Sequence, residues 1–259
     1  MQLVANLSLM FTELPMLDRL GAAKRAGFDF VEIQFPYEWE IGELVAARDE
    51  ADVGLVLINL LPGDRDRGEA GLMALPGREE DFREAVERGV EYASALGAKL
   101  INSLAGKPGD AARDEAVATA RANLAHAADR FAKIGATVLV EPVNPTDVPG
   151  FLLPRLADAL TLAKSAGREN VKVLFDLYHM QQTEPSLTDA ICEAAPTIGH
   201  VQFADTPGRH EPGTGVIDFD AALRTLREVG YDDYLSAEYR SEIPTAESLG
   251  WMDRFRSFM

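Results

Sequence analysis

Short apolar runs alternate along the chain with longer runs in which apolar residues recur at helical spacing. Most of the short runs are continuous and rich in β-branched residues, which is typical of strands buried on both faces of a parallel sheet. Eight of them are predicted to be strands, at 3–9, 28–35, 54–60, 98–104, 137–143, 171–177, 198–204 and 234–239.

Helical patterns fill the segments between these runs. In the stretch 78–97, for example, Phe82, Val86, Val90 and Ala93 recur at helical spacing. Five predicted helices end in a glycine just before an apolar run, which is a helix-stop signal. They span 14–27, 78–97, 112–135, 152–167 and 218–230.

Eight strands alternating with eight helices predict an α/β fold, a (β/α)8 TIM barrel. The alternative is an open doubly wound sheet. It loses its usual sequence support because N-L-S-L-M-F, rather than G-x-G-x-x-G, ends the first strand. We therefore expect no nucleotide cofactor. No long Ser/Gly-rich or Pro-rich linker divides the chain, so one domain over 1–259 is expected.

The charge balance narrows the class of partner. Lys and Arg number 25 against 42 Asp and Glu, which gives a net charge of −17. Such a surface repels nucleic acid and anionic membranes. The single cysteine, Cys192, cannot form an internal disulfide, and the first residues lack the features of a signal peptide. We expect a cytoplasmic protein that acts on a small molecule; a homo-oligomer remains open.

Four acidic or amide residues close four successive predicted strands in the second half of the chain. They are Glu141, Asp176, Gln202 and Glu238. Barrel active sites lie at the carboxyl ends of the strands, so all four side chains should point into one mouth. Three carboxylates and one amide oxygen suit Mg²⁺ or Mn²⁺ rather than zinc. For each carboxylate alone, the alternative is a helix cap or an ordinary loop charge, and for Gln202 it is a hydrogen bond to a neighbouring backbone group.

Three further residues lie in the loops beside these strand ends. His179 follows Asp176 by three residues and is predicted to contact substrate. Arg209 and His210 follow strand 198–204 within a frame of prolines and glycines, which favours a held conformation. An arginine there could bind a substrate carboxylate through two parallel hydrogen bonds. His200 is either a core histidine or a part of the site.

Longer strings carry a family resemblance. E-P-V-N-P-T-D-V-P-G (141–150), F-D-L-Y-H-M-Q (175–181) and G-H-V-Q-F-A-D-T-P-G-R-H-E-P-G-T-G (199–215) resemble the hydroxypyruvate isomerase family of the xylose-isomerase-like superfamily. The similarity covers nearly the whole chain. Glutamine at 202, where the superfamily's sugar epimerases usually carry histidine, favours the hydroxypyruvate branch.

The resemblance implies that the four strand-end residues hold the metal and that Glu141 and Glu238 also transfer protons. It implies isomerisation of hydroxypyruvate to tartronate semialdehyde through an enediolate. Related 2-oxo-tetronate isomerases share the motifs, and a ketose 3-epimerase would use the same metal and glutamates. An apurinic endonuclease would need a histidine-rich site and a basic face, which four histidines and a charge of −17 do not favour. A non-catalytic barrel would be expected to lack at least one of these residues.

Overall fold

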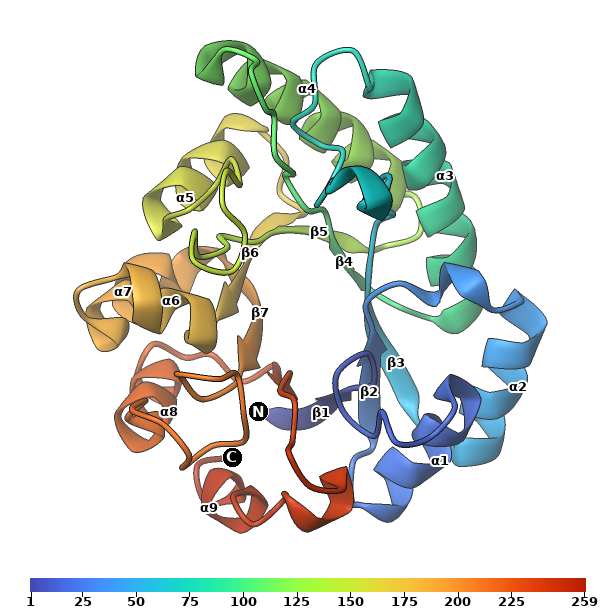
Figure 1. Ribbon diagram of the computed structural model, residues 1–259, viewed down its shortest axis with the longest axis vertical. Helices are drawn as coiled ribbons and strands as arrows, with labels where there is room; N and C mark the ends of the chain where they lie inside the picture. The colour runs from blue at the N-terminus through green and yellow to red at the C-terminus, as the bar shows by residue number, and fades with distance from the viewer.

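The strands of this protein form a closed barrel. The computed structural model describes residues 1–259, apart from the side chain of Arg65. Each strand pairs in parallel with the next, and β1 pairs with β8 to close the ring (Figure 1). The strands are β1 Gln2–Asn6, β2 Phe30–Ile33, β3 Gly54–Asn59, β4 Leu100–Asn102, β5 Thr137–Val140, β6 Val171–Asp176, β7 Ile198–Phe203 and β8 Tyr234–Ala237.

Helices surround the barrel and connect its strands (Figure 1). They are α1 Met16–Arg25, α2 Ile41–Ala51, α3 Glu79–Leu96, α4 Arg113–Ala132, α5 Leu156–Ser165, α6 Leu177–Thr183, α7 Leu187–Ala194, α8 Phe219–Glu228 and α9 Met252–Arg256. Short 3-10 helices lie at Pro36–Glu38, Arg65–Arg67, Ala195–Thr197 and Thr245–Glu247. The predicted single-domain TIM barrel is therefore confirmed.

The predicted ends of five helices at glycine are also confirmed. The five glycines after α1, α3, α4, α5 and α8 all have positive φ, which side chains with a Cβ rarely adopt. The prediction of one helix per unit was wrong between β6 and β7, where α6 and α7 both occur. Asp176 starts α6 directly, because its side chain accepts a hydrogen bond from the backbone N–H of Tyr178.

Strand alternation sets two layers on the inward face of the barrel. Residues two apart on a strand share a face. On four of the strands, the inward face carries an apolar residue followed two positions later by a polar one. These pairs are Val4 and Asn6, Leu100 and Asn102, Leu139 and Glu141, and Leu174 and Asp176. The apolar members are buried or partly buried and pack in one cluster. The polar members are buried above it, at the carboxyl ends of the strands.

A larger apolar cluster holds the helices against the barrel. Around β7 it contains Phe203, Phe255 and Trp251, with ring centroids 4.8–5.1 Å apart. Burying an aromatic or large aliphatic side chain stabilises the fold by about 1.5–3 kcal/mol. This packing fixes the wall from which Gln202 projects. Among the described residues, none of the helices combines the length and hydropathy that a membrane span requires.

Candidate active site

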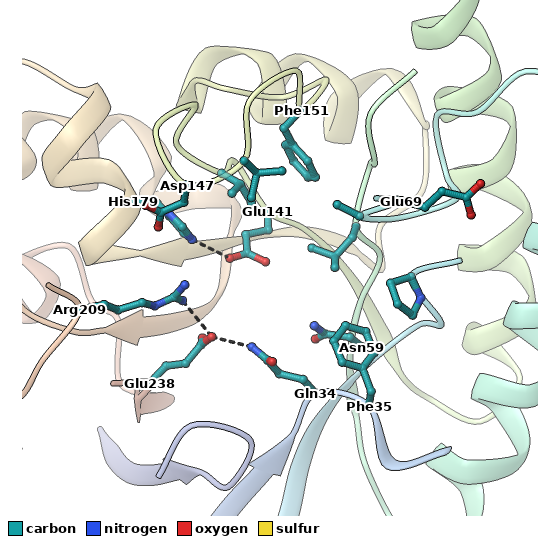
Figure 2. A pocket seen from close by; sticks show the side chains of 15 residues that line it. Gln34, Phe35, Asn59, Glu69, Glu141, Asp147, Phe151, His179, Arg209 and Glu238 are labelled. Atoms are coloured by element: carbon teal, nitrogen blue, oxygen red, sulfur yellow. Dashed lines mark hydrogen bonds and ion pairs between the residues drawn. The ribbon is translucent and has the colours of Figure 1, made fainter. Parts of the chain in front are cut away.

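A cavity of about 230 Å³ opens at the carboxyl ends of the strands. Glu141, His179, Arg209 and Glu238 line one side of it, and Gln34 and Asn59 line the other (Figure 2). Apolar side chains complete the wall, namely Phe35, Pro62, Ala70, Leu104, Val143, Val148 and Phe151. Four of the sequence-predicted site residues, Glu141, His179, Arg209 and Glu238, therefore line one pocket, whereas Asp176, Gln202 and His210 do not line it.

Glu141 extends from the end of β5 and is 7% exposed. One carboxylate oxygen accepts a hydrogen bond from Asn102 Nδ2 at 2.7 Å. Burial and the nearby charge of Asp176 raise the pKa of Glu141 to about 7. A carboxyl group with such a pKa can both take up and release a proton near neutral pH.

Asp176 ends β6 and is 1% exposed. Its Oδ1 accepts the hydrogen bond from the Tyr178 backbone N–H, while its Oδ2 lies 3.3 Å from Arg209 Nη2 and 3.6 Å from His179 Nε2. Burial raises the pKa of Asp176 and exceeds the opposing effect of Arg209. One oxygen therefore caps a helix and the other faces the site, so the helix-cap and ligand interpretations both apply.

Glu238 follows β8 and is 2% exposed. Its Oε1 accepts hydrogen bonds from Gln34 Nε2 at 2.6 Å and Arg209 Nη2 at 2.9 Å (Figure 2). Its Oε2 is buried and has no hydrogen-bond partner among the described residues. Burial raises the pKa of Glu238 well above its usual range, and the charges of Asp176 and Glu141 add to the effect.

Gln202 lies beside Asp176, since the two residues are register partners on β7 and β6. Its Nε2 donates a 2.6 Å hydrogen bond to Oε1 of Glu32, a fully buried carboxylate on β2. His200 is a core histidine: its Nε2 lies 2.8 Å from the other oxygen of Glu32. It is fully buried, deeper in the barrel than Gln202.

The tautomer of His179 follows from two hydrogen bonds of Asn144. The Asp147 N–H donates to Asn144 Oδ1 at 2.8 Å, which fixes the direction of the amide. Asn144 Nδ2 therefore faces His179 Nδ1 at 2.7 Å, and Nδ1 accepts this bond. The ring proton lies on Nε2, which points at Glu141 and Asp176 from 3.7 and 3.6 Å.

His179 is also held neutral. Burial lowers its pKa well below the usual value, and the charge of Arg209 adds to the effect. Glu141, Asp176 and His179 each offer an atom within 4.8 Å of the others, so together they could hold a cation. With its proton on Nε2, however, His179 acts as a hydrogen-bond donor toward the pocket rather than as a metal ligand.

Arg209 and His210 are neighbours in sequence but point to different places. Arg209 has a φ of 59°, an unusual conformation for a residue with a Cβ. Its guanidinium lies 5.0 Å from the ring centroid of Tyr178 and reaches Asp176 and Glu238. Burial alone would lower the pKa of Arg209, but the two carboxylates outweigh it and raise that pKa.

His210 turns away from the cavity. Its Nδ1 lies 2.6 Å from the backbone oxygen of Arg240, and its Nε2 lies 3.6 Å from Glu242. It does not line the pocket. The structure therefore brings Arg209 to the site as predicted in sequence and leaves His210 at the loop surface. The substrate contact of His210 stays a prediction without structural support.

The residues at this mouth fit a hard divalent cation. Three buried carboxylates with raised pKa values repel one another, and one of their oxygens is without a partner among the described residues. A cation that binds oxygen ligands would offset the repulsion between the carboxylates and would give the unpartnered oxygen a partner. Glu141, Asp176, Gln202 and Glu238 supply only oxygen for this purpose, provided that Gln202 presents its carbonyl.

Sequence reasoning missed the residues from the first half of the barrel. Asn6, Glu32, Gln34, Asn59 and Asn102 all lie at or just after the ends of β1 to β4, and most are buried. The signal was present, since Asn6, Gln34, Asn59 and Asn102 each follow an apolar run as Asp176 does. Glu32 was the clearest case, because it is a charged residue inside the otherwise apolar run FVEI.

Comparison with known proteins gives a consistent family. The model of the xylose isomerase-like TIM barrel family matches residues 20–255. A 2-oxo-tetronate isomerase from Cupriavidus necator is 43% identical, over 96% of each chain. A hydroxypyruvate isomerase from Escherichia coli is 40% identical, over 97% of this chain and 98% of that one.

A solved structure matches almost completely as well. It comes from Brucella melitensis and is described as an AP endonuclease of family 2. It is 36% identical, with a TM-score of 0.95 over 98% of both chains. The backbone of the barrel is therefore shared across this group, and the site must distinguish the activities.

Proposed function

We propose that this chain is a metal-dependent aldose–ketose isomerase of small hydroxy-oxo acids. The chain belongs to the xylose isomerase-like TIM barrel family, and its curated relatives include isomerases. Hydroxypyruvate is the substrate we favour, with tartronate semialdehyde as product. The observation that carries the proposal is the set of buried carboxylates at the barrel mouth, namely Glu141, Asp176 and Glu238. Gln202 completes the oxygen set.

Glu141, Asp176, Gln202 and Glu238 would hold Mg²⁺ or Mn²⁺. The bound cation would polarise the substrate carbonyl and stabilise the negative charge that develops on the substrate oxygens. Glu141 and Glu238 extend from β5 and from the end of β8, and both line the cavity (Figure 2). Both carboxylates are thus placed to reach a substrate bound in the cavity.

The reaction moves one proton between neighbouring carbons. One glutamate removes a proton from C3 of hydroxypyruvate, and the electron pair forms the enediolate. A glutamate then returns a proton to C2, and the proton of the C3 hydroxyl passes to the C2 oxygen, which leaves an aldehyde at C3 and a hydroxyl at C2. The Nε2–H of His179 can donate a hydrogen bond to a substrate oxygen as its charge grows. The substrate direction decides which glutamate acts first.

The dimensions of the cavity favour a short substrate. Its volume of about 230 Å³ is below the roughly 300–1,000 Å³ of typical ligand pockets. A substrate of three or four carbons is therefore favoured over a hexose. Arg209 is the cationic side chain among the described residues that line the cavity, and it is suited to a substrate carboxylate.

A 2-oxo-tetronate isomerase is the second candidate, because a relative with that name is 43% identical over nearly the whole chain. A ketose 3-epimerase shares the barrel with this chain, but the epimerase structures from Methylomonas and Clostridium cellulolyticum are only 18–21% identical and support the fold alone. An AP endonuclease activity is disfavoured by the net charge of −17.

Metal-dependent turnover on a substrate panel tests the proposal. The protein is stripped with a chelator, reloaded with Mg²⁺ or Mn²⁺, and assayed with hydroxypyruvate, 2-oxo-tetronates and neutral ketoses. We expect activity only after reloading, and a higher kcat/KM for acids than for ketoses. Full activity of the stripped protein, or a preference for ketoses, would contradict the proposal.

Two further predictions accompany the function. We expect the enzyme in the cytoplasm, because its single cysteine, Cys192, cannot form the internal disulfides that secreted proteins often carry. We also expect no binding to DNA, because its charge of −17 repels phosphates. Cell fractionation and a DNA-binding assay at low salt would test them.

A further inference from the structure

Glu32 is a buried carboxylate to which the proposed reaction assigns no part. It is fully buried inside the barrel, where hydrogen bonds from two other strands, β1 and β7, converge on it. Asn6 Nδ2 and Gln202 Nε2 donate to Oε1 at 2.7 and 2.6 Å. His200 Nε2 lies 2.8 Å from Oε2. We call these four residues, Glu32, Asn6, His200 and Gln202, the Glu32 cluster.

The contacts show that Glu32 acts as an acceptor. The direction of the Asn6 amide is fixed independently, because its Oδ1 accepts the backbone N–H of Ser8 at 3.0 Å. The NH2 group of Asn6 therefore faces Glu32. Both oxygens of Glu32 thus face side-chain donors, and Glu32 is an acceptor surrounded by donors.

This acceptor determines which end of the Gln202 amide faces the active site. An amide can present either its carbonyl oxygen or its NH2 group, and only the oxygen binds a cation. Glu32 binds the NH2 group of Gln202, so the carbonyl oxygen occupies the other end of the amide. Asp176 is the register partner of Gln202 on the neighbouring strand.

We infer that Glu32 is a positioning residue that turns the carbonyl oxygen of Gln202 toward the cation site. The inference rests on the proposed function, because it takes Gln202 as one of the ligands. Glu32 itself does not line the cavity. It acts through Gln202, and its removal should change metal binding even though every ligand remains.

The test exchanges the two side chains. In Glu32→Gln, one carbonyl oxygen replaces two carboxylate oxygens, so Asn6, His200 and Gln202 compete for it and the Gln202 amide is free to reverse. We expect Mn²⁺ to bind about 10–100-fold more weakly, as is typical for groups that orient metal ligands. The double variant Glu32→Gln/Gln202→Glu restores the pairing with donor and acceptor reversed. The amide introduced on β2 donates to the carboxylate introduced on β7, and that carboxylate presents oxygen in both directions.

Mn²⁺ is titrated into the metal-stripped variants, and electron paramagnetic resonance monitors how much of it is bound. This affinity is measured independently of activity. We expect the double variant to bind Mn²⁺ within about threefold of the wild type or more tightly. Single Gln202→Glu should be destabilised, since it places two carboxylates together without a donor. His200→Gln is the matched control: it changes the other oxygen of Glu32, so it should alter stability but change Mn²⁺ affinity less than about threefold.

The outcomes separate the inference from the proposed function. A folded Glu32→Gln variant that binds Mn²⁺ as the wild type does would overturn the inference and leave the isomerase intact. A double variant that folds but gains no affinity over Glu32→Gln would overturn it as well. A wild type that binds neither Mn²⁺ nor Mg²⁺ would overturn both proposals. If Glu32→Gln does not fold, side-chain amide NMR of the wild type decides, because the Gln202 NH2 signal must stay hydrogen-bonded when Mg²⁺ is added.

Discussion

Two groups of buried carboxylates in this barrel differ in the number of hydrogen-bond donors around them and in the direction of their pKa shifts. Glu32, in the Glu32 cluster, and Glu141 and Glu238, at the cavity, are all nearly inaccessible to solvent. The pKa of Glu32 is lowered, whereas the pKa values of Glu141 and Glu238 are raised. Burial is common to all three, so it cannot be the cause of the difference.

The difference lies in the partners. Three side chains donate to Glu32, from β1 and β7, and both of its oxygens have a partner. Glu141 accepts a hydrogen bond from Asn102, and one oxygen of Glu238 has no partner among the described residues. A carboxylate whose two oxygens both accept hydrogen bonds is held in its charged form and orients its neighbours. A carboxylate with an oxygen that lacks a donor stays available to a cation, a proton or a substrate.

The largest expected effect comes from removing the charge of a cavity carboxylate. Glu141→Gln and Glu238→Gln should each lower kcat by at least about 10²–10⁴-fold, the usual contribution of a positioned proton-transfer group. Their melting temperatures should not fall, because each variant removes a poorly solvated charge. Steady-state kinetics and thermal melts measure both quantities. Glu32→Gln should behave in the opposite way, with a clear loss of stability; equal melting behaviour in all three variants would break the comparison.

The next effect concerns the direction of the His179 ring. Asn144→Asp replaces the NH2 donor with an acceptor, so His179 Nδ1 must carry the proton and Nε2 loses it. We expect kcat to fall about 10–100-fold, in the range seen for groups that orient catalytic side chains. Asn170→Asp is a control remote from the cavity, since the Asn170 amide donates to the backbone oxygens of Ala128 and Ala136. Unchanged kcat in Asn144→Asp would show that the tautomer is irrelevant.

Arg209→Ala tests whether the guanidinium of Arg209 binds the substrate carboxylate. A charge-assisted bond to a substrate carboxylate contributes roughly 1.5–3 kcal/mol. We expect kcat/KM for hydroxypyruvate to fall by about tenfold or more, with a smaller loss for any neutral ketose. Arg240→Ala, an exposed neighbour outside the cavity, should change neither. Equal losses on acids and ketoses would instead assign Arg209 to holding Asp176 and Glu238 in place.

The smallest effect is the pH dependence of metal binding. The folded, metal-free protein has Glu141 with a pKa of about 7, above its usual value of 4.5. The neutral form therefore stabilises the metal-free fold fully below that usual value, and this contribution is lost as pH rises through about 7. Because the ligand must be ionised, Mn²⁺ affinity should fall up to about tenfold per pH unit below about pH 7. A titration that is flat between about pH 6 and pH 8 would contradict the raised pKa.

The sequence by itself determined the barrel and the positions of four site residues. Apolar strand runs and glycine-terminated helices are local signals, because a helix period or a left-handed glycine involves only nearby residues. Glu141, Asp176, Gln202 and Glu238 could be placed at one mouth, since parallel strands in a barrel end on the same face. Strand geometry alone carries that inference, with no knowledge of side-chain contacts.

Only the tertiary structure decided what each polar group does. Glu32 meets His200 and Gln202 across 168 and 170 residues of sequence, and no local pattern encodes that meeting. Arg209 turns into the cavity while His210 turns out, which depends on one backbone φ of 59°. The charge of a buried group depends on the donors and charges within a few ångströms. Those neighbours come from distant parts of the chain, so the contacts of Glu32, Asn144 and Arg209 follow only from the closed barrel.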